Sequence, residues 1–107
     1  MQQLFQNAQI AQPDGTLLPT DISVTDGIIA KFEPARGEPA PAGVQATDLH
    51  GLFVMPGGVD GHVHFDDPGF TEREDFSTGT MGAAAGGVTT VVDMPCTSLP
   101  PVTTPDN

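Results

Sequence analysis

The stretch "GVDGHVHFDDPGF", residues 58–70, places two histidines one residue apart and two aspartates before a Pro-Gly pair. Side chains alternate between the faces of a β-strand, so residues two apart share a face. A strand over residues 59–65 would therefore carry Asp60, His62 and His64 on one face. Imidazole nitrogen is a favoured ligand of Zn²⁺ and other divalent metals. Two interpretations stay open from these residues: half of a metal site, or a histidine pair on a solvent-facing strand.

The segment that follows predicts a βαβ unit. Residues 71–74, "TERE", fit the S/T-x-x-E capping box and predict a helix that runs through "DFSTGTMGAAA", residues 75–85. Gly86-Gly87 supplies its C-cap. The β-branched, largely apolar stretch "VTTVVDM", residues 88–94, predicts a strand buried on both faces. Strand, loop, helix and strand over residues 59–94 make one βαβ unit.

Residues 1–56 predict a small β-sandwich subdomain built from short strands and turns. The stretch "LFQNAQIA", residues 4–11, is the first strand. The stretch "DISVTDGIIAKFEP", residues 21–34, predicts a hairpin, because Asp26-Gly27 is the pair that a type I′ turn prefers. A further strand is expected within residues 44–57. Nothing in this part indicates catalysis.

Charge and cysteine content exclude several classes of protein. Acidic residues outnumber basic ones 14 to 3, a formal net charge of -11, which repels nucleic acid and anionic membranes, so we expect neither as a partner. The single cysteine, Cys96, excludes an internal disulfide and fits a reducing cytoplasm. The first residues do not resemble a signal peptide, and no apolar run approaches the roughly 18 residues of a membrane span. We therefore expect a cytoplasmic protein.

Two longer stretches carry a family resemblance: "VMPGGVDGHVHFDDPG", residues 54–69, and "DFSTGTMGAAAGGVTTVVDMP", residues 75–95. Together they resemble the opening of the amidohydrolase superfamily, and more narrowly the cyclic amidohydrolases, which are the allantoinases, hydantoinases and dihydroorotases. The resemblance covers residues 55 to about 104, and the hairpin region is similar to the family's small β-sandwich. It implies an α/β fold, the start of a (β/α)₈ TIM-type barrel. Residues 57–107 would form its first strand–helix–strand, so the barrel is incomplete in this N-terminal portion.

The resemblance also implies a metal centre. His62 and His64 would bind one ion of a two-metal site, with Zn²⁺ the expected cofactor and other divalent metals possible. The bridging carbamylated lysine, two further histidines and the aspartate that serves as general base are expected beyond Asn107, because Lys31 lies in the wrong subdomain. The implied chemistry is metal-assisted hydrolysis, in which a bridging hydroxide attacks a ring amide carbonyl polarised by the ions. The full-length enzyme would be a homo-oligomer acting on a small cyclic amide, and the 107 residues alone would be inactive.

The ring that is opened depends on a few positions. Dihydroorotases usually carry an arginine where this chain has Asp66 and an asparagine where it has Cys96, which disfavours an anionic substrate. Allantoinases resemble "DMPCTSLPPVTT", residues 93–104, but with an asparagine in place of Thr97. Hydantoinases commonly have an aspartate where Asp66 is. We rank allantoinase-like activity first, then hydantoinase/dihydropyrimidinase-like, then dihydroorotase. A non-catalytic, dihydroorotase-like barrel used for assembly is a further alternative.

Five residues near the histidines are candidates for contact with the substrate or the metal ligands. Each also has a structural interpretation, as a turn, a loop cap or a hydrogen-bonded strand residue. These candidates are Asp60, Asp66, Asp67, Asp93 and Thr97.

Overall fold

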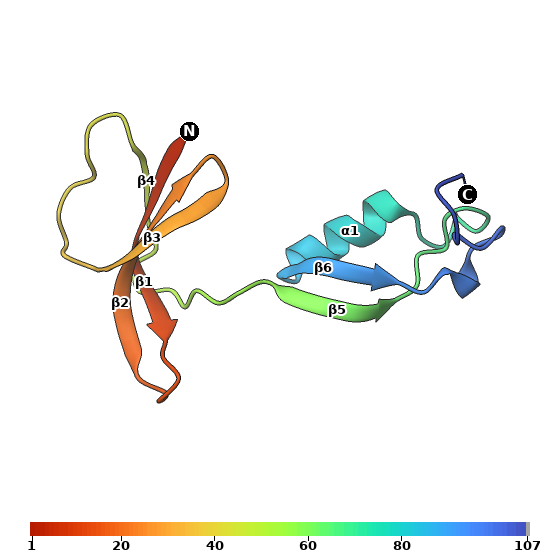
Figure 1. Cartoon of the computed structure of the whole chain (residues 1–107), viewed down its shortest axis with the longest axis horizontal. Helices are drawn as coiled ribbons and strands as arrows, with labels where there is room; N and C mark the ends of the chain where they lie inside the picture. Colours follow the sequence, from red (N-terminus) through yellow and green to blue (C-terminus); the bar gives the residue numbers. More distant parts are fainter. Residues whose placement is uncertain (107) are drawn as a thin grey trace. The chain divides into compact units, whose positions relative to one another are not determined.

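The computed structural model describes residues 1–106, so the end of the predicted second segment, Asn107, lies outside the described residues. The chain forms two compact units, Met1–Met55 and a second one that begins at Pro56 (Figure 1). The elements in chain order are β1 (Gln2–Ala11), β2 (Leu17–Thr25), β3 (Ile28–Pro34), β4 (Gln45–Asp48), β5 (Gly58–Val63), α1 (Phe76–Ala85), β6 (Val88–Asp93) and the 3₁₀ turn η1 (Pro95–Thr97).

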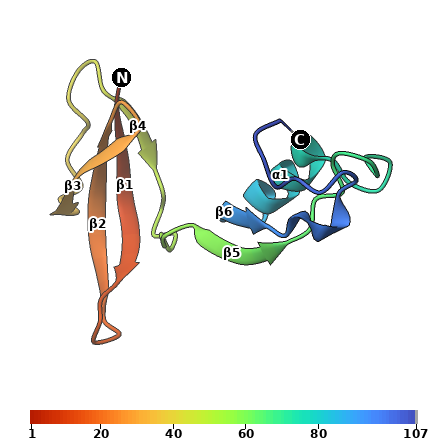
Figure 2. The ribbon, with the colours of Figure 1, turned by 45° about the vertical axis from the view of Figure 1, so that its right-hand side comes forward.

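The first unit is a four-stranded sheet in the order β3-β2-β1-β4. β1 and β2, and β2 and β3, pair antiparallel, whereas β4 pairs parallel with β1. The predicted hairpin is confirmed: β2 and β3 are joined by Asp26 and Gly27, whose φ angles of 50° and 81° are those of a type I′ turn. Figure 2 shows β2 running beside β1.

A bulge in β1 organises the small core of this sheet. Asn7 has a φ of 59° where the β1–β2 register shifts, and its backbone N–H donates to the Asp21 carboxylate at 3.0 Å. Next to it, Ala8 and Ile22 are buried. A β-sandwich needs two packed sheets, and the described residues of this unit form one. A second sheet would have to come from outside them.

The second unit confirms the predicted strand–helix–strand order. β5 and β6 pair parallel, and α1 lies along β6 (Figures 1 and 2). Parallel pairing brings the carboxyl ends of both strands to the same edge of the sheet. The expectation that the second strand is buried on both faces is not met among the described residues, because Val92 is 49% exposed. One helix covers one face of a strand pair and leaves the other face open.

The predicted helix start was wrong. Residues 71–73 form a turn, and the helix begins at Phe76 with Asp75 as its N-cap. Asp75 Oδ1 accepts the Thr78 backbone N–H at 2.7 Å, and the Thr78 side chain closes the capping box in place of Glu74. The predicted C-cap is confirmed, since the helix ends at Ala85 with Gly86 as its C-cap, and Gly87 follows with a φ of 80°. Over residues 1–106, no helix is long and apolar enough to cross a membrane.

Candidate metal centre

The histidine pair lies where β5 ends. His62 is the last residue but one of β5, and His64 follows the last strand residue, Val63. Both rings therefore project from the carboxyl end of the parallel strand pair. Their Nε2 atoms lie 3.2 Å apart, and the ring planes are inclined by 69°. Both residues are exposed. The prediction that the His62 and His64 side chains share a face is therefore confirmed by the approach of their Nε2 atoms.

The spacing of the two nitrogens fits a shared metal ion. Two ring nitrogens at the usual Zn–N distance, in tetrahedral geometry, would be separated by about 3.3 to 3.4 Å. The observed Nε2–Nε2 distance is 3.2 Å. The same distance also allows one imidazole to donate a hydrogen bond to the other. The spacing thus fits two ligands of a tetrahedral set as well as a hydrogen bond between the rings. No group of three or more His, Cys, Asp or Glu placed to hold a metal occurs among residues 1–106.

The carbonyl of Met94 orients one of the rings. It lies 3.3 Å from His64 Nδ1, a distance at which a proton on Nδ1 is donated to the carbonyl. That tautomer leaves the Nε2 lone pair free, which is the form a metal binds. The contact reaches His64 from the residue directly after β6. Sequence reasoning missed it, because a backbone carbonyl has no signature in the residue identity.

Two of the candidate aspartates bind backbone next to the histidines. Asp60 Oδ1 accepts the backbone N–H of His62 at 3.1 Å. Asp93 Oδ1 accepts the backbone N–H of Phe65 at 2.9 Å, across the strand pair. Asp60 therefore binds the backbone of His62 itself, and Asp93 binds the backbone of the residue that follows His64.

The other two aspartates lie in the loop after the histidines. The Asp66 carboxylate is 3.7 Å from Arg73 Nε, and its side chain is 14% exposed against 68% for Arg73. This guanidinium offsets the negative charge of Asp66, which weakens the sequence argument against an anionic substrate. Asp67 contributes its backbone carbonyl, which accepts a hydrogen bond from Ser98 Oγ at 3.2 Å. Asp66 and Asp67 thus have different surroundings, although the sequence treats them as one acidic pair.

The loop after β6 contributes hydroxyl groups. Thr97 Oγ1 lies 3.5 Å from the Phe65 carbonyl, and Ser98 Oγ donates to that carbonyl at 3.2 Å. Ser98 is buried, and sequence reasoning missed it, because nothing distinguishes it from other small polar residues of a Pro-rich loop.

The lysine, the third histidine and the cysteine of the chain have surroundings of their own. Lys31 forms an ion pair with Glu33 at 2.8 Å within β3. His50 lies in a turn, with its ring 3.4 Å from the Asp48 carboxylate. The Cys96 thiol is free and exposed.

Comparison with known proteins assigns the chain to a family. Residues 53–103 match the model of the amidohydrolase family. The chain is 45% identical to an allantoinase of Streptomyces avermitilis over 97% of its length, and 48% identical to a dihydroorotase of Methanothermobacter thermautotrophicus over 78%. These matches cover 23% and 18% of the two relatives, so the chain spans about a fifth of their length.

Solved structures give the same relationship. The L-hydantoinase (dihydropyrimidinase) of Arthrobacter aurescens superposes with a TM-score of 0.80 at 35% identity, covering 97% of this chain and 22% of that enzyme. The D-hydantoinase of a Thermus species superposes with a TM-score of 0.62 at 31% identity, covering 88% and 20%. The described mixture of strands and one helix therefore matches the N-terminal part of a hydantoinase. The chain belongs to the amidohydrolase family and is homologous to the N-terminal portion of allantoinases, dihydroorotases and hydantoinases.

Proposed function

We propose that these residues are the N-terminal part of a metal-dependent hydrolase that opens a cyclic amide. The observation that carries the proposal is the approach of His62 Nε2 and His64 Nε2 to 3.2 Å at the carboxyl end of β5. In (β/α)₈ barrels the active site lies at that end of the strands. β5, α1 and β6 would then be the first strand–helix–strand of such a barrel.

His62 and His64 would hold a divalent ion, with Zn²⁺ as the first choice, through their Nε2 lone pairs. A bound ion of this kind polarises an amide carbonyl and lowers the pKa of water. Within the chain, the Met94 carbonyl lies 3.3 Å from His64 Nδ1 and would accept a proton held on that nitrogen, which would leave Nε2 available for the ion. The remaining ligands and the general base would come from residues other than the described ones.

Allantoin is the first proposed substrate. Allantoinases of three organisms are 42 to 45% identical to this chain over 86 to 97% of its length, and dihydroorotases are 39 to 48% identical over 73 to 94%, so identity alone does not separate the two. The choice of allantoin rests on the resemblance of residues 93–104 to allantoinases. A hydantoin or dihydropyrimidine ring is the second candidate, supported by the superposition on the L-hydantoinase. Dihydroorotate is the third, and the Asp66–Arg73 ion pair removes part of the electrostatic objection to it.

Metal content and turnover of the full-length protein test the proposal. We expect zinc to co-purify with the protein, and His62→Ala to lower the zinc content. His50→Ala is the matched control, because His50 is also exposed but pairs with Asp48 in the first unit. An unchanged zinc content of the His62→Ala protein would refute the assignment of His62 as a metal ligand. Rates with allantoin, hydantoin and dihydroorotate then rank the substrates, and a metal-loaded protein inactive on all three would support the non-catalytic alternative.

A further inference from the structure

Phe65, the residue after His64, has both of its backbone polar groups in contact with distant residues. The N–H of Phe65 donates to Asp93 Oδ1 at 2.9 Å, and its carbonyl lies 3.2 Å from Ser98 Oγ, whose single proton it shares with the Asp67 carbonyl at the same distance. Both partners come from the end of β6 and the loop behind it. Partners 28 and 33 positions further along the chain thus hold the two peptide units that flank Phe65.

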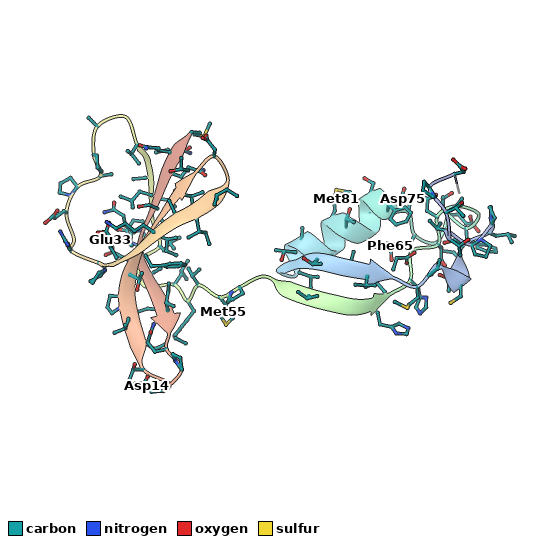
Figure 3. The ribbon with its side chains drawn as sticks, viewed as in Figure 1. Asp14, Glu33, Met55, Phe65, Asp75 and Met81 are labelled. Carbon is teal, nitrogen blue, oxygen red and sulfur yellow. The ribbon has the colours of Figure 1, made fainter. Side chains whose placement is uncertain are left out.

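The side chain of Phe65 is fixed as well. It is 4% exposed, and its ring centroid lies 5.0 Å from that of Phe76 at the start of α1. Figure 3 labels Phe65 between the strand pair and the helix. A Cβ added at Gly79 would lie 2.2 Å from Phe65 Cε1, so the helix backbone closes directly over the ring. With both its backbone and its ring held, Phe65 is an anchor directly beside the histidine.

Val63, the residue before His64, is held by Met94, which directly follows β6. The Met94 backbone N–H donates to the Val63 carbonyl at 2.8 Å, while the Met94 carbonyl lies 3.3 Å from His64 Nδ1. His64 itself lies past the last residue of β5, where the regular pairing of β5 with β6 has ended. Its backbone direction therefore depends on the contacts of its two neighbours.

From this arrangement we infer that Asp93 and Ser98 are positioning residues for His64. They act through the Phe65 backbone and aim the His64 ring at the point where its Nε2 meets that of His62. The inference rests on the proposed function, since a position of His64 matters for binding only if His64 is a metal ligand. Asp93 supplies a charged acceptor, which binds a backbone N–H more strongly than a neutral oxygen does. Loss of partners that orient metal ligands costs about 10- to 100-fold in metal affinity.

The test compares variants of the full-length protein by zinc affinity, measured by competition with a chelating dye, and by the absorption spectrum of bound Co²⁺. We expect Asp93→Ala to weaken zinc affinity about tenfold and to change the Co²⁺ spectrum. Asp93→Asn should restore most of the affinity, because its amide oxygen can accept the same N–H. Asp48→Ala is the matched control: Asp48 Oδ1 also accepts a backbone N–H, that of His50 at 2.8 Å, but in the first unit.

A merely structural Asp93 would give a different result. Asp93→Ala would then lower the melting temperature and leave zinc affinity and the Co²⁺ spectrum as in the parent, which would overturn the inference. If Asp93→Ala does not fold, Ser98→Ala decides: we expect a severalfold loss of zinc affinity, and unchanged affinity rejects the inference. His64→Ala separates the two proposals. Zinc affinity that survives this substitution refutes the proposed metal site, whereas its loss together with unaffected Asp93 and Ser98 variants refutes only the positioning role.

Discussion

The ring of Phe65 occupies the space that a side chain at Gly79 would need, with Cε1 only 2.2 Å from the position of a Cβ there. A glycine inside a helix is less favourable than alanine by about 1 kcal/mol. Gly79 is needed here because it lets the helix backbone pack directly against the Phe65 ring. We expect Gly79→Ala to destabilise the protein by about 1 to 3 kcal/mol through overpacking, as measured by urea unfolding.

Gly82→Ala is the matched control in the same helix. A Cβ at Gly82 would meet no atom within 4 Å. The substitution should therefore stabilise the protein by about 0.5 to 1 kcal/mol through helix propensity alone. Equal stabilisation by both alanines would show that Phe65 does not pack on Gly79.

The N-cap of α1 predicts a pH dependence. The Thr78 backbone N–H that Asp75 accepts lowers the pKa of this carboxyl below its ordinary value of 3.8. A carboxyl with a lower pKa in the folded state stabilises the fold above its unfolded pKa and loses that contribution as pH falls through the folded pKa. Unfolding measured at pH 7 and at a series of pH values below 3.8 should therefore show the contribution of Asp75 in full at pH 7 and progressively lost as the pH falls further below 3.8.

Asp75→Asn isolates this contribution. Asparagine caps helices about as well as aspartate but does not titrate. Three other acidic groups also have a lowered pKa and add to acid lability in both proteins: Asp14, Glu33 and Asp48. We expect the variant to match the parent near pH 7 and to lose less stability on acidification. Identical acid curves for the two proteins would contradict the role of Asp75.

Local sequence signals predicted the elements of both units. Asp26-Gly27 fixed the hairpin, because few other pairs tolerate two positive φ angles in succession. The alternation around His62 and His64 indicated that the rings share a face, and the structure brings their nitrogens together. These features depend on residues close in sequence, so periodicity and turn chemistry suffice.

Contacts between distant residues were beyond the same reasoning. Thr71 and Glu74 fit the capping-box pattern, yet residues 71–73 form a turn, and Asp75 caps the helix by accepting the Thr78 backbone N–H. The hydrogen bond of Asp93 to Phe65 joins residues 28 positions apart, and Ser98 reaches 33 positions back. Such pairs become visible only once β5 and β6 are placed side by side.

The Asp66–Arg73 ion pair predicts an effect on substrate preference. Removing the guanidinium leaves the Asp66 charge without its partner, which should repel an anionic ring more than a neutral one. Because Arg73 is mostly exposed, solvent screens the pair, and we expect Arg73→Ala to lower kcat/KM for dihydroorotate relative to allantoin by only about two- to fivefold. Arg36→Ala, at an exposed arginine of the first unit, should leave the ratio unchanged. An equal change for both substrates in Arg73→Ala would place the pair away from the substrate.

The 107 residues by themselves should neither turn over a ring substrate nor retain zinc through dialysis. A zinc site in a protein has four ligands as a rule, or three when one position is kept open for water or substrate. The described residues bring together two, His62 and His64, and no group of three candidate ligands occurs among them. Zinc content after dialysis, measured beside the full-length protein, tests this, with circular dichroism showing whether the strands and the helix are present. Stoichiometric zinc or hydrolysis of allantoin by the folded fragment would mean that these residues complete a site by themselves, for example by pairing the histidines of two copies.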